Sequence, residues 1–240
     1  MIFISEHNLY FFYEQTEVLA QLEAKKIPVD SFFVCEQTLK QLPETLSSQD
    51  ALASALLTSD LFQNLAAQKP LKVGSFQIKL SKNLIHVECP IQLGIQDNNQ
   101  HRIATIGFFL QSQGGKLELH INHIQGERKR QNELKLFSEQ VGENWRVWVA
   151  KRLKRIAERK KAKPVGVLPS LFFLFGACSS PGEYKRQVRQ YLQTFRKAGI
   201  TTIDSHNVKP YPQKDREFYR KFKAEQRAKN KQNKPKKRPL

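Results

Sequence analysis

The sequence predicts an α+β (or α/β) fold, in which an antiparallel-rich mixed sheet carries helices on both sides. Three segments with different hydrophobic periods lead to this prediction. Apolar residues recur every three or four positions over residues 1–70, every second position over 71–126, and every three or four positions again over 127–203. We therefore expect a single globular domain over 1–203, followed by a basic, largely disordered tail over 204–240.

The first 70 residues are expected to be mainly helical. A helical stripe runs from Leu9 to Leu22 and ends near Pro28. A second helix over 50–67 begins after a capping serine, Ser47 or Ser48. Between the two helices, the short apolar run 31–35 is interpreted as a strand.

The middle of the chain predicts an antiparallel meander. Apolar residues alternate with polar ones over 76–80, 85–95, 104–110 and 117–121. The connections are short, because residues 97–99 (Asp-Asn-Asn) form one turn and the Gly114-Gly115 pair forms a hairpin loop. One face of this sheet is expected to pack against a core.

The last part of the domain alternates helices and strands. A helix is predicted over 131–162, interrupted or kinked near Gly142, with a strand over 165–168 after it. The segment 180–183 (Ser-Pro-Gly-Glu) is a capping box that starts the next helix, and Gly199 ends that helix. Residues 201–203 are a plausible final strand.

This order of elements resembles that of the GNAT acyltransferase superfamily. The stretch Leu117-Glu-Leu-His-Ile-Asn-His-Ile-Gln-Gly126, followed by a basic helix and Val165-Gly-Val, is also similar to the VirK-like bacterial family. The likeness covers about residues 73–203 as topology. In GNAT enzymes, a Gln/Arg-x-x-Gly-x-Gly/Ala turn after the fourth strand binds the pyrophosphate of acyl-CoA through its backbone N–H groups.

The resemblance implies an acyltransferase, active or degenerate, as an alternative function. The corresponding turn begins with Gln125 but has one glycine at a different spacing, so basic side chains would take the place of backbone contacts. The acyl-CoA site would then comprise Gln125, Gly126, Arg128, Lys129 and Arg130. The resemblance also suggests a catalytic tyrosine on a late helix, and Tyr184, Tyr191 and Tyr219 are candidates.

The strongest charge feature is the C-terminal segment 207–240, which holds 13 Lys or Arg residues against three acidic ones in a chain of net charge +18. Such a segment has little apolar surface to bury, so it is expected to stay extended unless a polyanion neutralises it. Nucleic acid is the commonest such partner, since each phosphate contact releases counterions. The alternative is a tail that serves only solubility. The tail residues predicted to bind phosphate are Lys234, Lys236, Lys237 and Arg238.

A second basic element lies on the helix after Asn144, where residues 151–163 carry eight basic residues against Glu158. Trp148 and three arginines form a stripe beside the apolar one, and guanidinium groups near an indole suit phosphate contacts and base stacking. The alternative is a solvated basic face with Trp148 at the edge of the core. The predicted nucleic-acid-binding residues here are Trp148, Lys151, Arg152, Lys154, Arg155, Arg159, Lys160 and Lys161. The leading hypothesis is a protein that binds nucleic acid or a ribonucleoprotein, without a cofactor.

Other classes of protein are less well supported. The longest apolar run, 165–178, is short for a membrane span, and the N-terminus lacks a basic region and a cleavage site. Three distant cysteines, Cys35, Cys89 and Cys178, fit free thiols in the cytoplasm. The tail also suits a secreted bacterial effector or a protein that adheres to anionic membranes.

The histidines do not predict a metal site. His120 and His123 are three apart on an alternating strand, so we expect them on opposite faces. A cross-strand cluster of His86, Glu88, Glu118 and His120 could transfer protons. Its alternative is an ordinary set of exposed polar residues on a sheet, with His123 in the core.

Overall fold

The protein is built on one seven-stranded mixed sheet. The computed structural model describes residues 18, 20–25, 29–39, 41–43, 45–80, 90–168 and 181–204, all within the compact unit Met1–Asn207. The strands lie in the sheet in chain order, antiparallel from the first to the fifth and parallel from the fifth to the seventh. They are β1 (Leu71–Val73), β2 (Phe76–Leu80), β3 (Ile91–Gln96), β4 (Arg102–Gln113), β5 (Lys116–Gly126), β6 (Lys163–Leu168) and β7 (Thr201–Asp204). The predicted α+β class and antiparallel-rich mixed sheet are confirmed.

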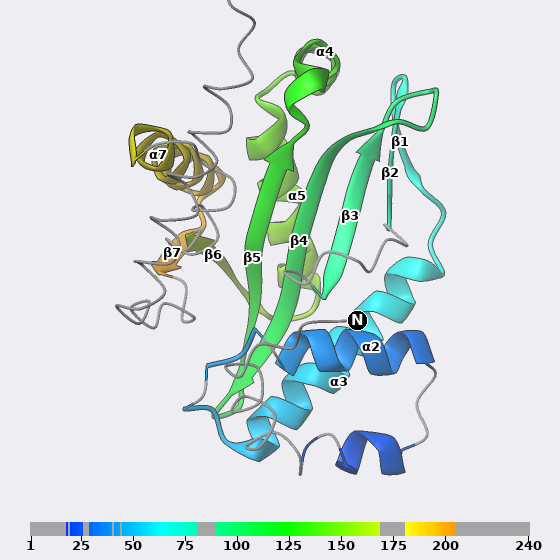
Figure 1. Cartoon of the computed structure of the whole chain (residues 1–240), viewed down its shortest axis with the longest axis vertical. Helices are drawn as coiled ribbons and strands as arrows, with labels where there is room; N and C mark the ends of the chain where they lie inside the picture. The colour runs from blue at the N-terminus through cyan, green and yellow to red at the C-terminus, as the bar shows by residue number, and fades with distance from the viewer. Residues whose placement is uncertain are drawn as a thin grey trace, which may run out of the picture. The chain divides into compact units, whose positions relative to one another are not determined.

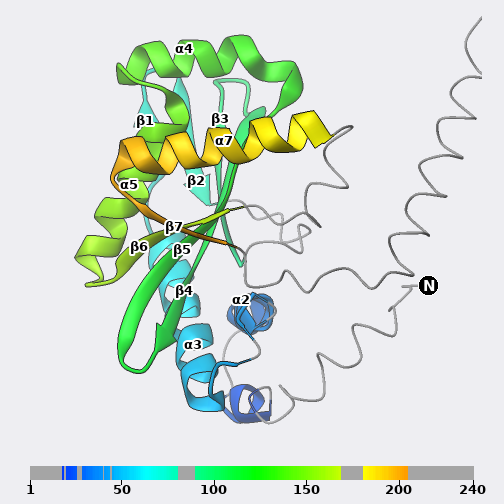
Figure 2. The same ribbon diagram turned by 90° about the vertical axis from the view of Figure 1, so that its left-hand side faces the viewer.

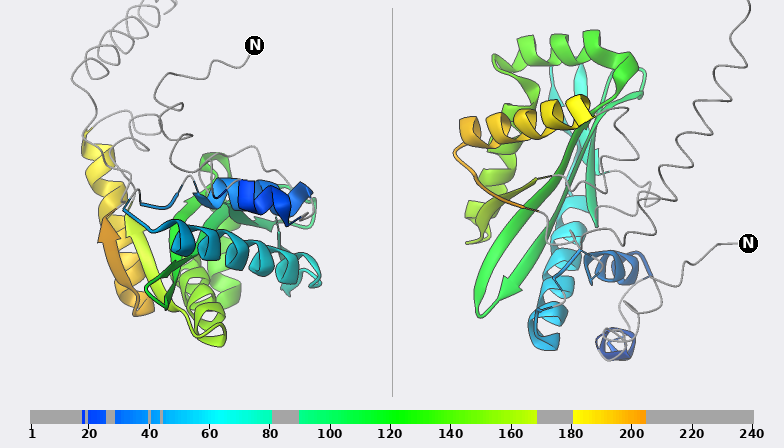
Figure 3. Two further views of the ribbon diagram at one scale, coloured as in Figure 1. Left: turned by 90° about the horizontal axis from the view of Figure 1, so that it is seen from below. Right: turned by 60° about the vertical axis from the view of Figure 1, so that its left-hand side comes forward.

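Helices cover both faces of the sheet (Figure 1). The helices are α2 (Val29–Leu39), α3 (Ser48–Ala66), α4 (Gln131–Val141), α5 (Trp145–Arg159) and α7 (Pro181–Ala198), with a short 3-10 turn, η1 (Arg128–Arg130), before α4. Seen along the strands, α2 and α3 lie on one side of β4 and β5 and α5 on the other (Figure 3).

Alternate residues of β4 pack against the two helical layers. Phe108 on one face belongs to the cluster that contains Leu153 of α5. Phe109 on the other face packs with Cys35 of α2 and Ala55 of α3. Because both faces are covered, β4 is buried from residue 103 to residue 111.

Helix α3 also covers the edge of β4 that β3 leaves open. Strand β3 pairs with β4 only as far as Phe108. Beyond that point, Thr58 Oγ1 accepts the Leu110 N–H at 3.0 Å, and its one proton is within donating distance of the carbonyls of Ser54 (2.8 Å) and Leu110 (3.1 Å). Ser54 Oγ accepts the Ser112 N–H at 2.8 Å. Two hydroxyl groups therefore satisfy backbone groups that a neighbouring strand would otherwise pair.

Local signals set the helix ends, and the sequence predicts the serine cap of α3 and the interruption near Gly142. The Ser47 side chain accepts the Asp50 N–H at 3.1 Å and caps α3. Gly142, with φ of 71°, ends α4 in the left-handed conformation, and the Asn144 side chain caps α5 by accepting the Arg146 N–H. The expected interruption of the helix over 131–162 is thus a complete break between α4 and α5.

The predicted strand at 31–35 is wrong, because these residues belong to helix α2. The buried residues Ser31, Val34, Cys35, Thr38 and Leu39 recur at helical spacing and face α3 and the sheet. The helical spacing could not be recognised from the sequence, because apolar residues fill most of 31–35. The short edge strand β1 was not predicted.

Cys35 is a free, buried thiol, and burial raises its pKa to about 11, which leaves it unreactive. The expected helix residues 1–17, strand residues 85–89, capping residue Ser180 and the tail after residue 204 lie outside the described residues, as do Cys89 and Cys178.

Candidate nucleic-acid interface

Helix α5 separates an apolar face from a basic one. Trp145, Val149 and Leu153 are buried in the main core, and Ile156 packs against it, as the sequence predicts. The exposed residues of the helix and of the turn after it are basic apart from Glu158. They are Lys151, Arg152, Arg155, Arg159, Lys160 and Lys161.

Two of the predicted lysines already have partners. Lys151 Nζ lies 2.6 Å from Glu143 Oε2 in an ion pair. Lys154 Nζ donates to the carbonyl of Gly199 at 3.2 Å, so it holds the end of α7 against α5. The ion pair of Lys151 is partly exposed, and a phosphate can compete for it at little cost.

Trp148 lies at the edge of the core. Its ring meets the Phe137 ring edge-on, with centroids 5.5 Å apart, and the Arg152 guanidinium lies over it at 4.8 Å. The predicted pairing of indole and guanidinium is therefore present, although the half-buried indole also serves packing. Base stacking by Trp148 stays a prediction.

Helix α7 adds a second row of basic residues that sequence reasoning did not include in the site. Tyr191 and Phe195 of α7 pack in the same core cluster as Leu153 and Ala157 of α5, so the helices are neighbours (Figure 2). The signal was the strongly amphipathic period of α7. Its exposed basic residues are Lys185, Arg186, Arg189, Arg196 and Lys197. These five residues and the six exposed basic residues of α5 and of the turn after it are together called the α5–α7 basic surface.

The tail residues predicted to bind phosphate, Lys234, Lys236, Lys237 and Arg238, lie outside the described residues. Their role stays a prediction.

A polar pocket lies where β5 runs into η1. Its volume is about 650 Å³, and its lining contains all five residues of the predicted acyl-CoA turn. The other lining residues are Gln92, Arg102, Thr105, His123 and Glu127. Sheet register brings these together, because Gln92 and His123 both pair with Gly107, and Thr105 pairs with Gln125. Sequence reasoning missed Gln92, Arg102 and Thr105, since pairing between distant strands has no local signal.

The pocket is mainly cationic. Arg102 Nε lies 3.5 Å from Glu127 Oε1, and Arg130 Nη1 lies 2.9 Å from Glu133 Oε1. The hydrogen bond from Arg130 lowers the pKa of the Glu133 carboxyl. Arg128 and Lys129 are exposed at the same turn.

Gly126 serves packing at this turn. A Cβ there would lie 2.5 Å from Leu134 Cδ1 and 3.1 Å from Trp145 Cζ2. The absence of a side chain lets β5 turn closely over α4 and α5. Beside it, the Ile124 N–H donates to the Tyr191 hydroxyl at 2.9 Å, where β5 has already separated from β6. Acyl-CoA binding and a catalytic role for Tyr191 stay predictions, and the side chains of Tyr184 and Tyr219 are not described.

The two histidines of β5 lie on the same face of the sheet, contrary to the prediction. The register of β4 and β5 shifts by one residue at a bulge, so that Gly107 pairs with His123, Phe108 with Ile121 and Phe109 with His120. The extra residue changes the alternation by one position. Sequence alternation alone does not reveal such a bulge.

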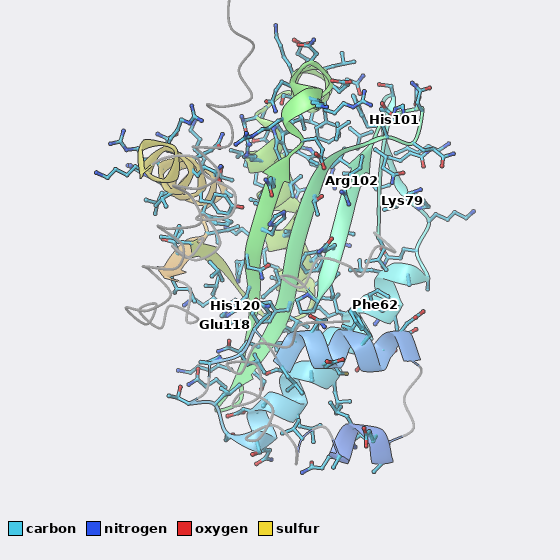
Figure 4. All side chains as sticks on the ribbon, viewed as in Figure 1. Phe62, Lys79, His101, Arg102, Glu118 and His120 are labelled. Carbon is cyan, nitrogen blue, oxygen red and sulfur yellow. The ribbon has the colours of Figure 1, made fainter. Side chains whose placement is uncertain are left out.

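His120 is buried, not exposed as its polar surroundings in sequence suggest. Its Nε2 atom lies 3.0 Å from Glu118 Oε2, and Lys163 Nζ lies 3.7 Å from Glu118 Oε1. The hydrogen bond with His120 lowers the pKa of Glu118, and Lys163 adds to this effect. Figure 4 shows His120 and Glu118 well away from Arg102, so they do not belong to the pocket. His86 and Glu88 lie outside the described residues.

The described residues lack two features that would point to a function. They contain no cluster of three or more His, Cys, Asp or Glu side chains that could hold a metal ion. No helix among them is long and apolar enough to cross a membrane. The chain matches no protein-family model, no curated protein and no solved structure.

Proposed function

We propose that the protein binds nucleic acid through the α5–α7 basic surface. The observation that carries this proposal is the arrangement of exposed Lys and Arg side chains on two packed helices. Among the side chains of these helices that the structure describes, Glu158 is the single exposed acidic one. The apolar sides of the helices are anchored in the core, so the cations sit on a rigid support. A phosphate backbone then meets many positive charges without ordering a flexible segment.

The composition of the surface favours phosphate contacts over base reading. Phosphate contacts fix position and supply salt-dependent affinity, whereas sequence is read by contacts to base edges. Arg residues contribute forked donors that match phosphate oxygens, and Lys residues contribute point charges. We therefore expect binding with little sequence preference. The tail would extend the same contacts along the strand.

The competing interpretation is that the basic surface serves only to keep the protein soluble. The two differ in how binding responds to salt. Phosphate contacts release counterions, so the logarithm of the association constant falls linearly with the logarithm of salt concentration, by about 0.9 per contact on duplex DNA and about 0.7 on single strands.

The test is binding of labelled RNA and DNA by the full chain across a salt series. The variant combines Arg155→Gln, Arg159→Gln and Lys160→Gln, all exposed. The matched control combines Lys69→Gln, Lys72→Gln and Lys116→Gln, which are also exposed and remove the same charge elsewhere in the chain.

We expect the variant to lower the salt slope by about two to three units and the control to leave it nearly unchanged. Equal loss in both would mean that net charge alone attracts the polymer, and would overturn the assignment to α5 and α7. Absence of binding by the unchanged chain at low salt would overturn the proposal as a whole.

A further inference from the structure

The pocket beside η1 opens on the face of the sheet opposite α5. Gln92 and His123 pair with Gly107, and Thr105 shares the face of Gly107 and Phe109 because side chains alternate along β4. Phe108, on the other face, packs in the cluster that contains Leu153 of α5. The pocket is therefore separated from α5 by the sheet.

The rim of the pocket carries four cations and one carboxylate. Arg128, Lys129 and Arg130 come from η1, and Arg102 comes from the start of β4. The Arg102 Nε atom is buried and makes no hydrogen bond with the described residues, since its contact with Glu127 at 3.5 Å is an ion pair only. A buried guanidinium N–H of this kind gains most from an anion that approaches it.

The floor of the pocket is polar throughout. None of the ten residues that line it has an apolar side chain, and the sheet contributes two amides, a hydroxyl and an imidazole through Gln92, Gln125, Thr105 and His123. Thr105 is only 7% exposed and Gln92 only 6%, so both are held in place by packing. Such groups can donate to and accept from hydroxyls, whereas a hydrocarbon chain would offer them no hydrogen bonds.

We infer that this pocket binds a small phosphorylated sugar. Arg128 and Lys129 meet the phosphate, with Arg102 as a further donor, and the floor residues meet the sugar hydroxyls. The volume of about 650 Å³ lies within the range of about 300–1,000 Å³ that is typical of small-molecule sites. The inference goes beyond nucleic-acid binding, from which it differs in both place and ligand.

The experiment is calorimetric titration of the full chain at low salt with ribose 5-phosphate. Inorganic phosphate and ribose are titrated separately, because they carry the two halves of the ligand. Adenosine monophosphate and coenzyme A test larger molecules that contain the same ribose phosphate group. Thermal stabilisation by each compound gives a second measure of binding.

Two variants separate the rim from the floor. Arg128→Gln with Lys129→Gln should weaken ribose 5-phosphate and inorganic phosphate alike, by about tenfold or more, because charge-assisted hydrogen bonds are lost. Thr105→Val keeps the shape of the side chain but removes its hydroxyl. It should weaken ribose 5-phosphate several-fold and leave inorganic phosphate unchanged. The control Lys69→Gln with Lys72→Gln should change neither.

The inference is overturned if ribose 5-phosphate does not bind at millimolar concentration. It is also overturned if inorganic phosphate binds as tightly as the sugar phosphate, which would mean non-specific anion binding. Tighter binding of coenzyme A than of ribose 5-phosphate, without response to Thr105→Val, would overturn it as well. The Arg155, Arg159 and Lys160 triple variant should retain sugar phosphate binding. Failure of this inference is therefore distinct from failure of the nucleic-acid proposal.

Discussion

At the residue scale, two glycines on neighbouring parts of the sheet have very different surroundings. A Cβ on Gly126 would lie 2.5 Å from Leu134 Cδ1 and 3.1 Å from Trp145 Cζ2. A Cβ on Gly94 would lie at ordinary contact distance, 3.7 Å from Arg102 Cδ and 4.0 Å from the Ala104 carbonyl oxygen. Neither glycine has a positive φ, so the difference is one of space and not of backbone strain.

We expect Gly126→Ala to lower the free energy of unfolding by about 1–3 kcal/mol, because the methyl group must displace two packed side chains. Gly94→Ala should change it by no more than about 0.5 kcal/mol. Urea denaturation of both variants measures the two values. Similar losses in both would show that the contact with Leu134 and Trp145 is not the cause.

The Glu118 carboxyl predicts a pH dependence of stability. The hydrogen bond with His120 and the charge of Lys163 lower its pKa in the folded protein, against an opposing effect of burial. A carboxyl with a depressed folded pKa adds stability above its unfolded pKa and loses that contribution as the pH falls through the folded value. Since the ordinary value is 4.5, the loss begins near that pH and continues below it.

Glu118→Gln should therefore be less stable than the unchanged chain at pH 6, and the difference should shrink as the pH falls below about 4.5. Denaturation of both chains between pH 6 and pH 3 measures it. A difference that stays constant over this range would show that the carboxylate charge contributes nothing. Glu133→Gln is a useful comparison, because the pKa of Glu133 is also lowered, but by a surface partner, Arg130.

At the element scale, α3 takes the place of a strand along part of β4. The Thr58 hydroxyl accepts the Leu110 N–H in a fully buried position, and its proton lies between the carbonyls of Ser54 and Leu110. Thr58→Val would remove the acceptor of the Leu110 N–H, so we expect a loss of about 1–3 kcal/mol in the free energy of unfolding.

The matched control is Thr38→Val. Thr38 is equally buried, but its hydroxyl donates to the Val34 carbonyl, which lies in the same helix. Its removal leaves the backbone bonds of the helix intact, so we expect a loss below about 1 kcal/mol. Urea denaturation compares the two variants. Equal costs would mean that the hydroxyl of Thr58 does not support the edge of β4.

At the scale of the whole molecule, the two faces of the sheet carry different surfaces. The helices α5 and α7 present cations beyond one face, and the polar pocket opens on the other. A chain ending at Asn207 should retain binding to nucleic acid at low salt, with a smaller salt slope, because the basic surface of the folded unit remains. Loss of all binding on this truncation would assign the contacts to the tail alone.

Most elements were predictable because their signals are local. Alternation identified the strands 76–80, 104–110 and 117–121, and the period of α5 identified its buried side. The prediction failed at 31–35, where five consecutive residues without a charge concealed the helical spacing of Val34, Thr38 and their buried neighbours. Tertiary burial decided between helix and strand there.

The residues of the candidate binding surfaces were likewise predictable only where their signals are local. Basic residues of α5 were recognisable because charge and period lie in one continuous segment. The contribution of α7 depends on its packing beside α5, and the pocket depends on strand pairing between Gln92, Thr105 and His123. Contacts between residues this far apart in the chain leave no recognisable pattern in any short stretch of sequence.

The sequence by itself determined the α+β class, a serine cap before α3 and an interruption near Gly142, because each depends on neighbours within a few residues. Only the tertiary structure decided the bulge that places His120 and His123 on one face, the position of α3 along β4 and the lining of the pocket. These features arise from the register of distant strands, which is selected by burial over the whole core and not by any local preference.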